Sequence, residues 1–299
     1  DDRFFDTYDL DVINMCGNRG DPATSKDLFE ICEYLFYKQN DLRITIATNG
    51  GLKTAKYWKD LGELFSFYNT KSKVTFGIDG LKDTNHIYRQ NVIFDRVMKN
   101  AQGFIEGGGT AWWQYLVFKH NQHQVEEAKK LSDDMGFEKF FIIHTPRFAH
   151  KQEGEGKMLF TYKGKEFILE TADPEFGKRQ EAYKFIKSDD GEEIDCKALE
   201  NTEFYIDNGG RVIPCCWLGN SLDWMMGGDN RVRDRVMMLY DPIEMNAINN
   251  DLVDLLQHDF MSKHVPMAWE NISGDDCAAK TCKMFCSKTK NIRKSAIVL

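Results

Sequence analysis

Residues 10–145 alternate between two spacings of apolar and polar positions, one typical of strands and the other of helices. Short apolar or β-branched runs at 10–15, 43–48, 73–78, 112–118 and 140–144 predict buried strands. Between them, apolar residues recur at helical spacing in 26–39, 54–64, 94–105 and 122–135. The adjacent Trp112 and Trp113 are expected on opposite faces of their strand. Strands that alternate with helices imply right-handed βαβ units and a parallel sheet.

The number of strands limits the architecture of this α/β region. About five strands are too few for a closed barrel of eight βα units. We therefore expect either an open or partial barrel or a doubly wound sheet. In both architectures ligands bind at the carboxyl ends of the strands, which here carry residues 16–22, 48–51, 79–80, 119–120 and His144.

The composition changes after about Pro146, which predicts a connector and a second unit after the α/β region. Residues 147–195 are polar and rich in charge, and we interpret them as a connector with a hairpin at 158–167. Residues 196–299 contain most of the cysteines and are expected to form a second unit. The predicted division is therefore 1–146, 147–195 and 196–299.

Charge and cysteine usage narrow the class of protein. The chain of 299 residues has a formal net charge of −8, which argues against nucleic acid as a partner because such binders usually carry a basic excess. No run of 18 apolar residues occurs, so no membrane association is expected. No secretion signal accompanies the eight cysteines. Metal or cluster binding is thus favoured over disulfides, and a cytoplasmic location is expected.

Six of the eight cysteines lie after residue 195. Cys196 precedes a predicted hairpin at 202–214 with an Asn-Gly turn, and the hairpin leads into Cys215 and Cys216. A second group follows near the end of the sequence, at Cys277, Cys282 and Cys286. Thiolates select zinc or iron–sulfur clusters, and four of these residues would suffice for either. The alternative is that they are buried structural cysteines.

Polar residues at the predicted strand ends form a second candidate site. Gly20 would let the backbone approach a ligand closely, and the Asp21 carboxylate would pair with an ammonium group. Asn49 and Asp79 belong to ordinary turn dipeptides, and only their recurrence at successive strand ends gives them weight. Arg89 would bind a carboxylate in a bidentate manner, or would simply be a solvated loop residue. No residue is identified as catalytic.

Together these residues resemble the radical S-adenosylmethionine enzymes that carry a C-terminal SPASM or twitch-type extension. Residues 16–22 look like the family's Gly-Gly-Glu-Pro motif, with Arg19 and Asp21 in place of the first Gly and the Glu. Residues 48–50 are similar to its Thr-Asn-Gly, and residues 77–81 with 86–89 to its Ser-Ile-Asp-Gly and downstream Tyr-Arg. The spacings Gly210-x4-Cys215 and Cys282-x3-Cys286, with Cys196 upstream, resemble the extension.

The resemblance implies a partial (β/α)6 TIM-like barrel that lacks its first unit, followed by a small cysteine-rich α+β domain. It implies that Gly20 and Asp21 contact the amino end of S-adenosylmethionine. Asn49, Asp79 and Arg89 would then lie near its ribose and carboxylate. It further implies one auxiliary [4Fe-4S] cluster, for which the candidate ligands are Cys196, Cys215, Cys282 and Cys286. Cys277 competes with Cys282 for this role, and Cys216 competes with Cys215.

The function that the resemblance implies is formation of a 5′-deoxyadenosyl radical that abstracts a hydrogen atom. A peptide or small protein would be the substrate, and a flavodoxin or ferredoxin would donate electrons. The family's Cys-x3-Cys-x2-Cys motif, however, does not occur in this sequence. We expect that an N-terminal segment carrying it is missing, and that the chain as given is catalytically inert. The alternatives are a degenerate or split non-catalytic module that binds iron–sulfur or zinc and recruits a peptide or partner subunit, and a zinc-stabilised structural domain.

Overall fold

The computed structural model describes residues 2–17, 20–68, 71–144, 156–176, 194–226, 234–270, 279–286 and 296–298. The chain divides into two compact units. One contains residues 9–184 and 294–299, and we call it the sheet unit. The other contains residues 1–8 and 185–293, and we call it the cysteine unit.

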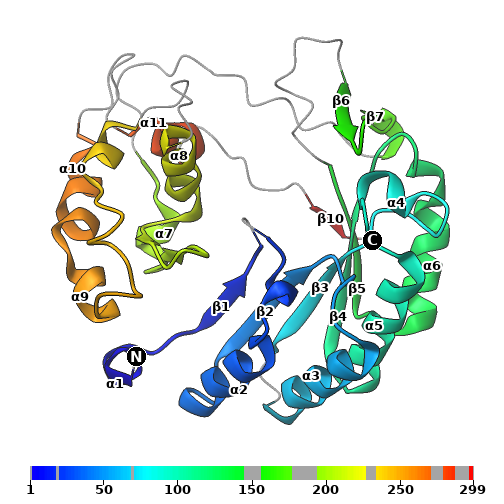
Figure 1. The fold of residues 1–299 in the computed structure, drawn as a ribbon, viewed down its shortest axis with the longest axis horizontal. Coiled ribbons are helices and arrows are strands. Elements are labelled where there is room, and N and C mark those ends of the chain that lie inside the picture. The colour runs from blue at the N-terminus through cyan, green and yellow to red at the C-terminus, as the bar shows by residue number, and fades with distance from the viewer. Residues whose placement is uncertain are drawn as a thin grey trace. The chain divides into compact units, whose positions relative to one another are not determined.

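The sheet unit contains the five parallel strands that the sequence predicts. They are β1 (Val12–Met15), β2 (Arg43–Thr48), β3 (Lys73–Gly77), β4 (Thr110–Leu116) and β5 (Lys139–Ile143). They lie side by side in chain order, and β10 (Ala296–Val298) adds an antiparallel strand beside β5 (Figure 1). An order without reversal is singly wound, so the doubly wound alternative is wrong. In the part of the chain that the structure describes the sheet is open, with β1 and β10 as its edges.

The main helices of this unit are α2 (Leu28–Lys38), α3 (Ala55–Tyr68), α5 (Phe94–Glu106) and α6 (Val125–Met135), which continues the short 3-10 helix η2 (Gln122–Gln124). Right-handed crossovers in a singly wound sheet place all of them on one face (Figure 1). Alternate strand residues such as Ile44 and Trp113 are fully buried against that layer. Trp112 is only half-buried, so the two tryptophans lie on opposite faces as predicted.

Glycines allow α3 and α5 to pack unusually closely. A Cβ atom on Gly62 would lie 2.3 Å from the carbonyl oxygen of Phe104. A Cβ atom on Gly103 would lie 2.4 Å from the carbonyl oxygen of Ala55. Any side chain at either position would push the two helices apart. This contact fixes the helix layer behind β3 and β4.

A β-hairpin follows the sheet, as the sequence predicts. Its strands are β6 (Lys157–Tyr162) and β7 (Lys165–Glu170), and the 3-10 helix η4 (Pro174–Phe176) comes next. The hairpin is joined to the end of β4, because the Lys119 N–H donates to the Glu170 carbonyl at 3.0 Å. The Lys119 side chain also pairs with Asp173. Short elements at the strand ends are η1 (Pro22–Thr24) and α4 (Asn85–Tyr88).

The cysteine unit is made of short elements. The predicted Asn-Gly hairpin is present as β8 (Tyr205–Ile206) and β9 (Val212–Ile213), in antiparallel register. The helical elements are α1 (Asp2–Thr7), α7 (Lys197–Glu200), α8 (Cys216–Met226), η5 (Arg235–Leu239), α9 (Leu252–Gln257), the π-helical turn η6 (Phe260–His264), α10 (Val265–Met267) and α11 (Lys280–Cys286). They pack around a separate buried core that includes Val212, Met245 and Phe260.

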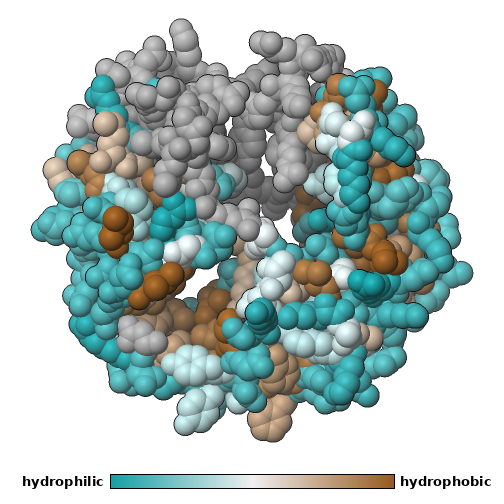
Figure 2. Space-filling view, in the orientation of Figure 1, coloured by the Kyte–Doolittle hydropathy of each residue, from teal (hydrophilic) through white to brown (hydrophobic). Residues whose placement is uncertain are grey.

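Hydrophilic residues cover most of the helical surface of the sheet unit in the view of Figure 2. Exposed apolar residues are present as well, and Tyr37 and Phe67 are examples. Within the described ranges, we find no helix that combines the length and the apolar character needed to cross a bilayer.

Candidate functional site

The Asp21 carboxylate joins the turn after β1 to the end of β2. Oδ1 accepts the Ala23 N–H at 2.9 Å, which caps η1, and Oδ2 accepts the Asn49 N–H at 2.7 Å. The Thr48 hydroxyl lies 2.8 and 2.9 Å from the two oxygens. A carboxylate has about four acceptor positions, and this chain itself uses most of those of Asp21. Asp21 therefore holds the two strand ends together. Gly20, beside it, is exposed and has a φ of +137°.

The turn after β2 is rigid. The Asn49 side-chain oxygen accepts the Gly51 N–H at 2.8 Å, which forms an Asx turn. Gly50 has a φ of +69°, and a Cβ there would lie 2.9 Å from both Phe76 and Val97. Asn49 is half-buried at this edge of the sheet.

Asp79 follows β3, and its side chain is completely buried. Oδ2 accepts the Arg89 Nε–H at 2.5 Å, and Oδ1 accepts the Leu116 N–H at 2.6 Å. Burial raises the pKa of Asp79 above its ordinary value, while the Arg89 guanidinium and the Leu116 N–H oppose that rise. Because its carboxylate is completely buried, Asp79 acts on any ligand only through Arg89.

Arg89 brings the ends of β2 and β3 into one site. Its side chain is one quarter exposed, and a Cβ on Gly77 would lie 2.5 Å from its Nη2 atom. The same Gly77 position is 3.6 Å from the Thr48 carbonyl oxygen. The guanidinium also lies over the Tyr88 ring, at 5.3 Å. Its two terminal nitrogens form no hydrogen bond with described residues, so they are available to a carboxylate.

Sequence reasoning missed one residue that supports this edge of the sheet. Asn121 is fully buried, and its Nδ2 atom donates to the carbonyl oxygens of Asp79 at 2.8 Å and Leu116 at 3.0 Å. Its Oδ1 atom accepts the Phe118 N–H at 2.7 Å. A single asparagine after a strand carries no pattern that would reveal this role. Asn121 locks the carboxyl ends of β3 and β4 together.

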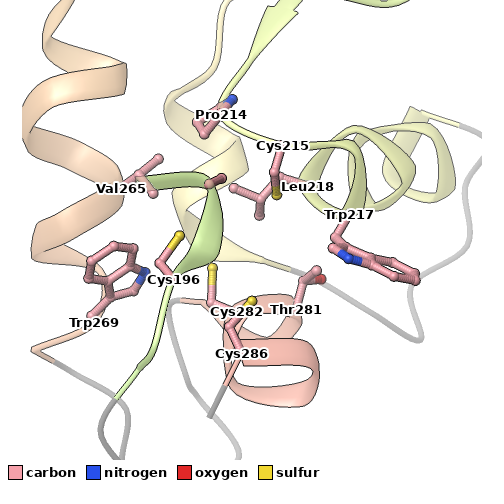
Figure 3. A pocket seen from close by; sticks show the side chains of 11 residues that line it. Cys196, Pro214, Cys215, Trp217, Leu218, Val265, Trp269, Thr281, Cys282 and Cys286 are labelled. Carbon is pink, nitrogen blue, oxygen red and sulfur yellow. The ribbon is translucent and has the colours of Figure 1, made fainter. Parts of the chain in front are cut away.

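Four cysteines line one pocket in the cysteine unit, namely Cys196, Cys215, Cys282 and Cys286. Figure 3 shows their sulfur atoms turned toward the same space. They come from three separate segments, just before α7, just before α8 and within α11. Cys216 does not belong to the pocket lining that the structure describes, and Cys277 lies outside the described residues. Of the other cysteines, Cys16 is exposed and Cys32 is buried in the core of the sheet unit.

Cys215 lies at the N-terminal end of α8. Burial raises the pKa of its thiol to about 12, while the backbone N–H groups of Leu218 and Trp217 oppose that rise. Burial also raises the pKa of Cys282 well above its ordinary value. Thiol ligands bind a metal as thiolates, so metal binding would release their protons.

A buried carboxylate positions the last two cysteines. Cys282 and Cys286 are four residues apart on α11, so they lie on one face of the helix. Asp234 accepts the Thr281 N–H at 2.8 Å and the Thr281 hydroxyl at 2.5 Å. It also accepts the hydroxyl of Ser221, on α8. Asp234 thus fixes α11 relative to the helix that begins beside Cys215.

The indole of Trp269 is a further polar group in this pocket. Its Nε1 atom is buried and has no oxygen or nitrogen acceptor in the described structure. The nitrogen-bearing edge of the ring faces the sulfur atoms (Figure 3), and it opposes the rise in the pKa of Cys282. The N–H is therefore a donor directed at sulfur.

The donor set can be compared with the needs of a single metal ion and of a cluster. A tetrahedral zinc ion would need its sulfur ligands about 2.3 Å from one point. In the described part of the chain, no group of three or more His, Cys, Asp or Glu side chains is arranged to hold a metal ion. A four-iron cluster binds each thiolate at a different iron atom, so its ligands need not converge. Four thiols around one pocket, with N–H donors nearby, fit such a cluster.

The fold and the two sites define an α/β protein that has a polar site at its strand ends and a thiol-lined pocket in a second unit. No family model matches the chain, and no curated protein matches it. Among solved structures it is similar to SuiB of Streptococcus suis, with a TM-score of 0.47 and 16% identity over 91% of this chain. The SuiB structures bound to S-adenosylmethionine and to the precursor peptide SuiA each give a TM-score of 0.46 and 16% identity, over 90% and 84% of this chain.

The chain spans only 57%, 55% and 55% of these three SuiB chains, in the same order. The likeness is too distant to assign a ligand or a substrate. S-adenosylmethionine and the precursor peptide SuiA are ligands of SuiB in those structures, and the likeness does not assign them to this chain.

Proposed function

We propose that this chain is the S-adenosylmethionine-binding and auxiliary-cluster part of a radical enzyme that modifies a peptide or small protein. The observation that supports this most is that Cys196, Cys215, Cys282 and Cys286 line one pocket. They are the cysteines whose spacing resembles the SPASM or twitch-type extension. The strand order also agrees with a partial barrel, in which the helices cover one face and the strand ends bind the ligand.

In the cysteine unit, these four thiolates would hold one [4Fe-4S] cluster. Such a cluster, when bound, supplies one-electron transfer or a binding site for substrate. The chain contributes the rest. Asp234 holds α11 in place, α8 directs backbone N–H groups at Cys215, and the apolar lining, such as Val265 and Leu218, excludes water.

In the sheet unit, the strand ends would bind S-adenosylmethionine. The terminal nitrogens of Arg89 are available to its carboxylate, and Asp79 holds the guanidinium in that position. Asn49 lies at the same edge and would reach the ribose. Asp21 and the exposed backbone of Gly20 would form the turn at the amino end of the ligand. An electron donor such as flavodoxin or ferredoxin would complete the reaction.

A second candidate is a non-catalytic module that binds a cluster or zinc and recruits a peptide or partner subunit. This candidate needs only the thiol-lined pocket of the cysteine unit and no ligand at the strand ends. The two candidates agree on the thiol-lined pocket and differ in whether S-adenosylmethionine is bound.

Anaerobic reconstitution followed by iron and sulfide analysis tests the cluster. We expect about four irons per chain, and a loss of iron in Cys196→Ser, Cys215→Ser, Cys282→Ser and Cys286→Ser. Cys216→Ser is the matched control, because Cys215 lines the pocket and the adjacent Cys216 does not. The Cys216→Ser variant should keep the iron. Cys277→Ser decides whether that residue competes with Cys282. Bound zinc without iron would overturn the cluster assignment.

Equilibrium dialysis with labelled S-adenosylmethionine tests the second site separately. Arg89→Lys keeps the charge but loses the bidentate geometry, so it should weaken binding about tenfold or more, by roughly 1.4 kcal/mol. Lys82→Ala, a change at an exposed ion pair, should have no effect. If the wild-type chain binds iron but not S-adenosylmethionine, the module replaces the enzyme as the proposed function.

A further inference from the structure

The indole N–H of Trp269 is the polar group that the pocket leaves without an oxygen or nitrogen partner. Its Nε1 atom is buried and has no oxygen or nitrogen acceptor in the described structure, and its effect on the pKa of Cys282 is that of a donor to this sulfur. Figure 3 shows this edge of the ring facing the cysteine sulfurs. A buried N–H group that stays unpaired is costly, so its surroundings should contain an acceptor when the pocket is filled.

The remaining lining of the pocket offers few other acceptors. Ala198, Pro214, Leu218 and Val265 present apolar side chains, and the Thr281 hydroxyl is already engaged with Asp234. Sulfur is therefore the acceptor chemistry that the Trp269 N–H faces. Trp217 also lines the pocket, but its ring is substantially exposed.

We infer that Trp269 donates an N–H···S hydrogen bond to the cluster or to its Cys282 thiolate and thereby sets the reduction potential of the cluster. This inference rests on the proposed cluster. Reduction adds one negative charge to the cluster, and a fixed donor stabilises that charge more than it stabilises the oxidised form. Trp269 thus raises the reduction potential. The backbone N–H groups of Trp217 and Leu218 act in the same sense on Cys215, but substitution of a side chain cannot remove them.

Trp269→Phe removes the N–H while it keeps an aromatic ring in place. We expect unchanged iron and sulfide content and a reduction potential shifted to more negative values. A tenfold change in the equilibrium between the oxidised and reduced forms corresponds to about 59 mV for one electron. Trp112→Phe is the control, a change of the same kind at a half-buried ring outside the pocket lining, and it should leave the potential unchanged. Equal potentials in wild type and Trp269→Phe, with full iron content, would overturn the inference.

A spectroscopic measurement covers the case in which Trp269→Phe fails to bind iron. The double variant Trp217→Phe and Trp224→Phe, labelled with ¹⁵N-indole, leaves Trp269 as the labelled indole of the cysteine unit. We expect a ¹⁵N hyperfine coupling to the reduced cluster, and its absence would refute the hydrogen bond. A chain that binds no iron in any form refutes the proposed function instead, so the two failures are distinguishable.

Discussion

Replacing Arg89 by Met should lower the free energy of unfolding of the sheet unit by about 3–5 kcal/mol. Asp79 is 0% exposed, and Arg89 Nε lies 2.5 Å from its Oδ2 atom. Removing the guanidinium leaves a buried carboxylate with the Leu116 N–H as its remaining donor. The cost is that of a buried charge without its partner, and it far exceeds the contribution of an exposed ion pair.

Lys82→Met provides the matched control. Lys82 Nζ lies 2.7 Å from Asp95 Oδ2, but the two side chains are 74% and 55% exposed. Solvent screens such a pair, so its loss should cost less than about 1 kcal/mol. The two variants remove the same kind of charge from similar distances and differ mainly in burial.

The effect should also depend on pH. The folded-state pKa of Asp79 is already raised by burial, and without Arg89 it rises further. A folded-state pKa above the unfolded value means that stability is lost as pH rises through that interval. The loss in Arg89→Met should therefore be larger at pH 8 than at pH 5. Urea unfolding and hydrogen exchange of the Leu116 amide measure this loss of stability at each pH. A loss below about 1 kcal/mol at pH 8, equal to that of Lys82→Met, would refute the view that Arg89 compensates a buried charge.

Three further outcomes are expected. Asp234→Ala should destabilise the cysteine unit by about 3 kcal/mol or more, because buried donors of Thr281 and Ser221 lose their acceptor. Asp234→Asn keeps one acceptor oxygen and should destabilise the unit less. Thermal unfolding measures the difference between the two variants. Burial, with smaller effects of His123 and His86, lowers the pKa of His120 to about 4. The neutral imidazole of His120 therefore contributes to stability above about pH 6.5, and this contribution is lost as pH falls toward 4. The urea midpoint of His120→Asn should therefore change less between pH 7 and pH 5 than the midpoint of the wild-type chain. Gly62→Ala should destabilise the sheet unit by about 1–3 kcal/mol despite the higher helix propensity of alanine, and a melting temperature at or above wild type would contradict this.

The elements that the sequence predicts well are those whose pattern is local. The run at 43–48 coincides with β2, and the Asn-Gly turn lies between β8 and β9. The elements that it misses depend on distant partners. β10 has three residues and forms by pairing with β5, more than 150 positions earlier in the chain. α1 has six residues and is anchored by the buried side chain of Phe4, with exposed ion pairs of Arg3 to Asp251 and Asp254 beside it. Neither is long enough to carry a periodic signal.

The candidate sites divide in the same way. Residues 79–80 have the composition of an ordinary turn, yet the structure buries Asp79 because Arg89, Leu116 and Asn121 provide its environment. Those partners lie 10 to 42 positions away, so no local pattern could reveal the burial. The cysteine candidates named from the sequence include the four that line the pocket, but Asp234, just before η5, and Trp269, just after α10, carry no such signal. Single residues of this kind become visible only after the chain has folded.

In both sites the chain itself engages the carboxylates and leaves donors beside them. Asp21, Asp79 and Asp234 are all engaged by donors of the chain itself, so these carboxylates build the sites without being free to bind a ligand. Donors remain beside these carboxylates, namely the terminal nitrogens of Arg89 and the Nε1 atom of Trp269. A site that retains donors after its acceptors are satisfied suits a ligand that carries negative charge. The ligand carboxylate proposed for Arg89 and the cluster sulfur proposed for Trp269 both meet that requirement, although the chain has a net charge of −8.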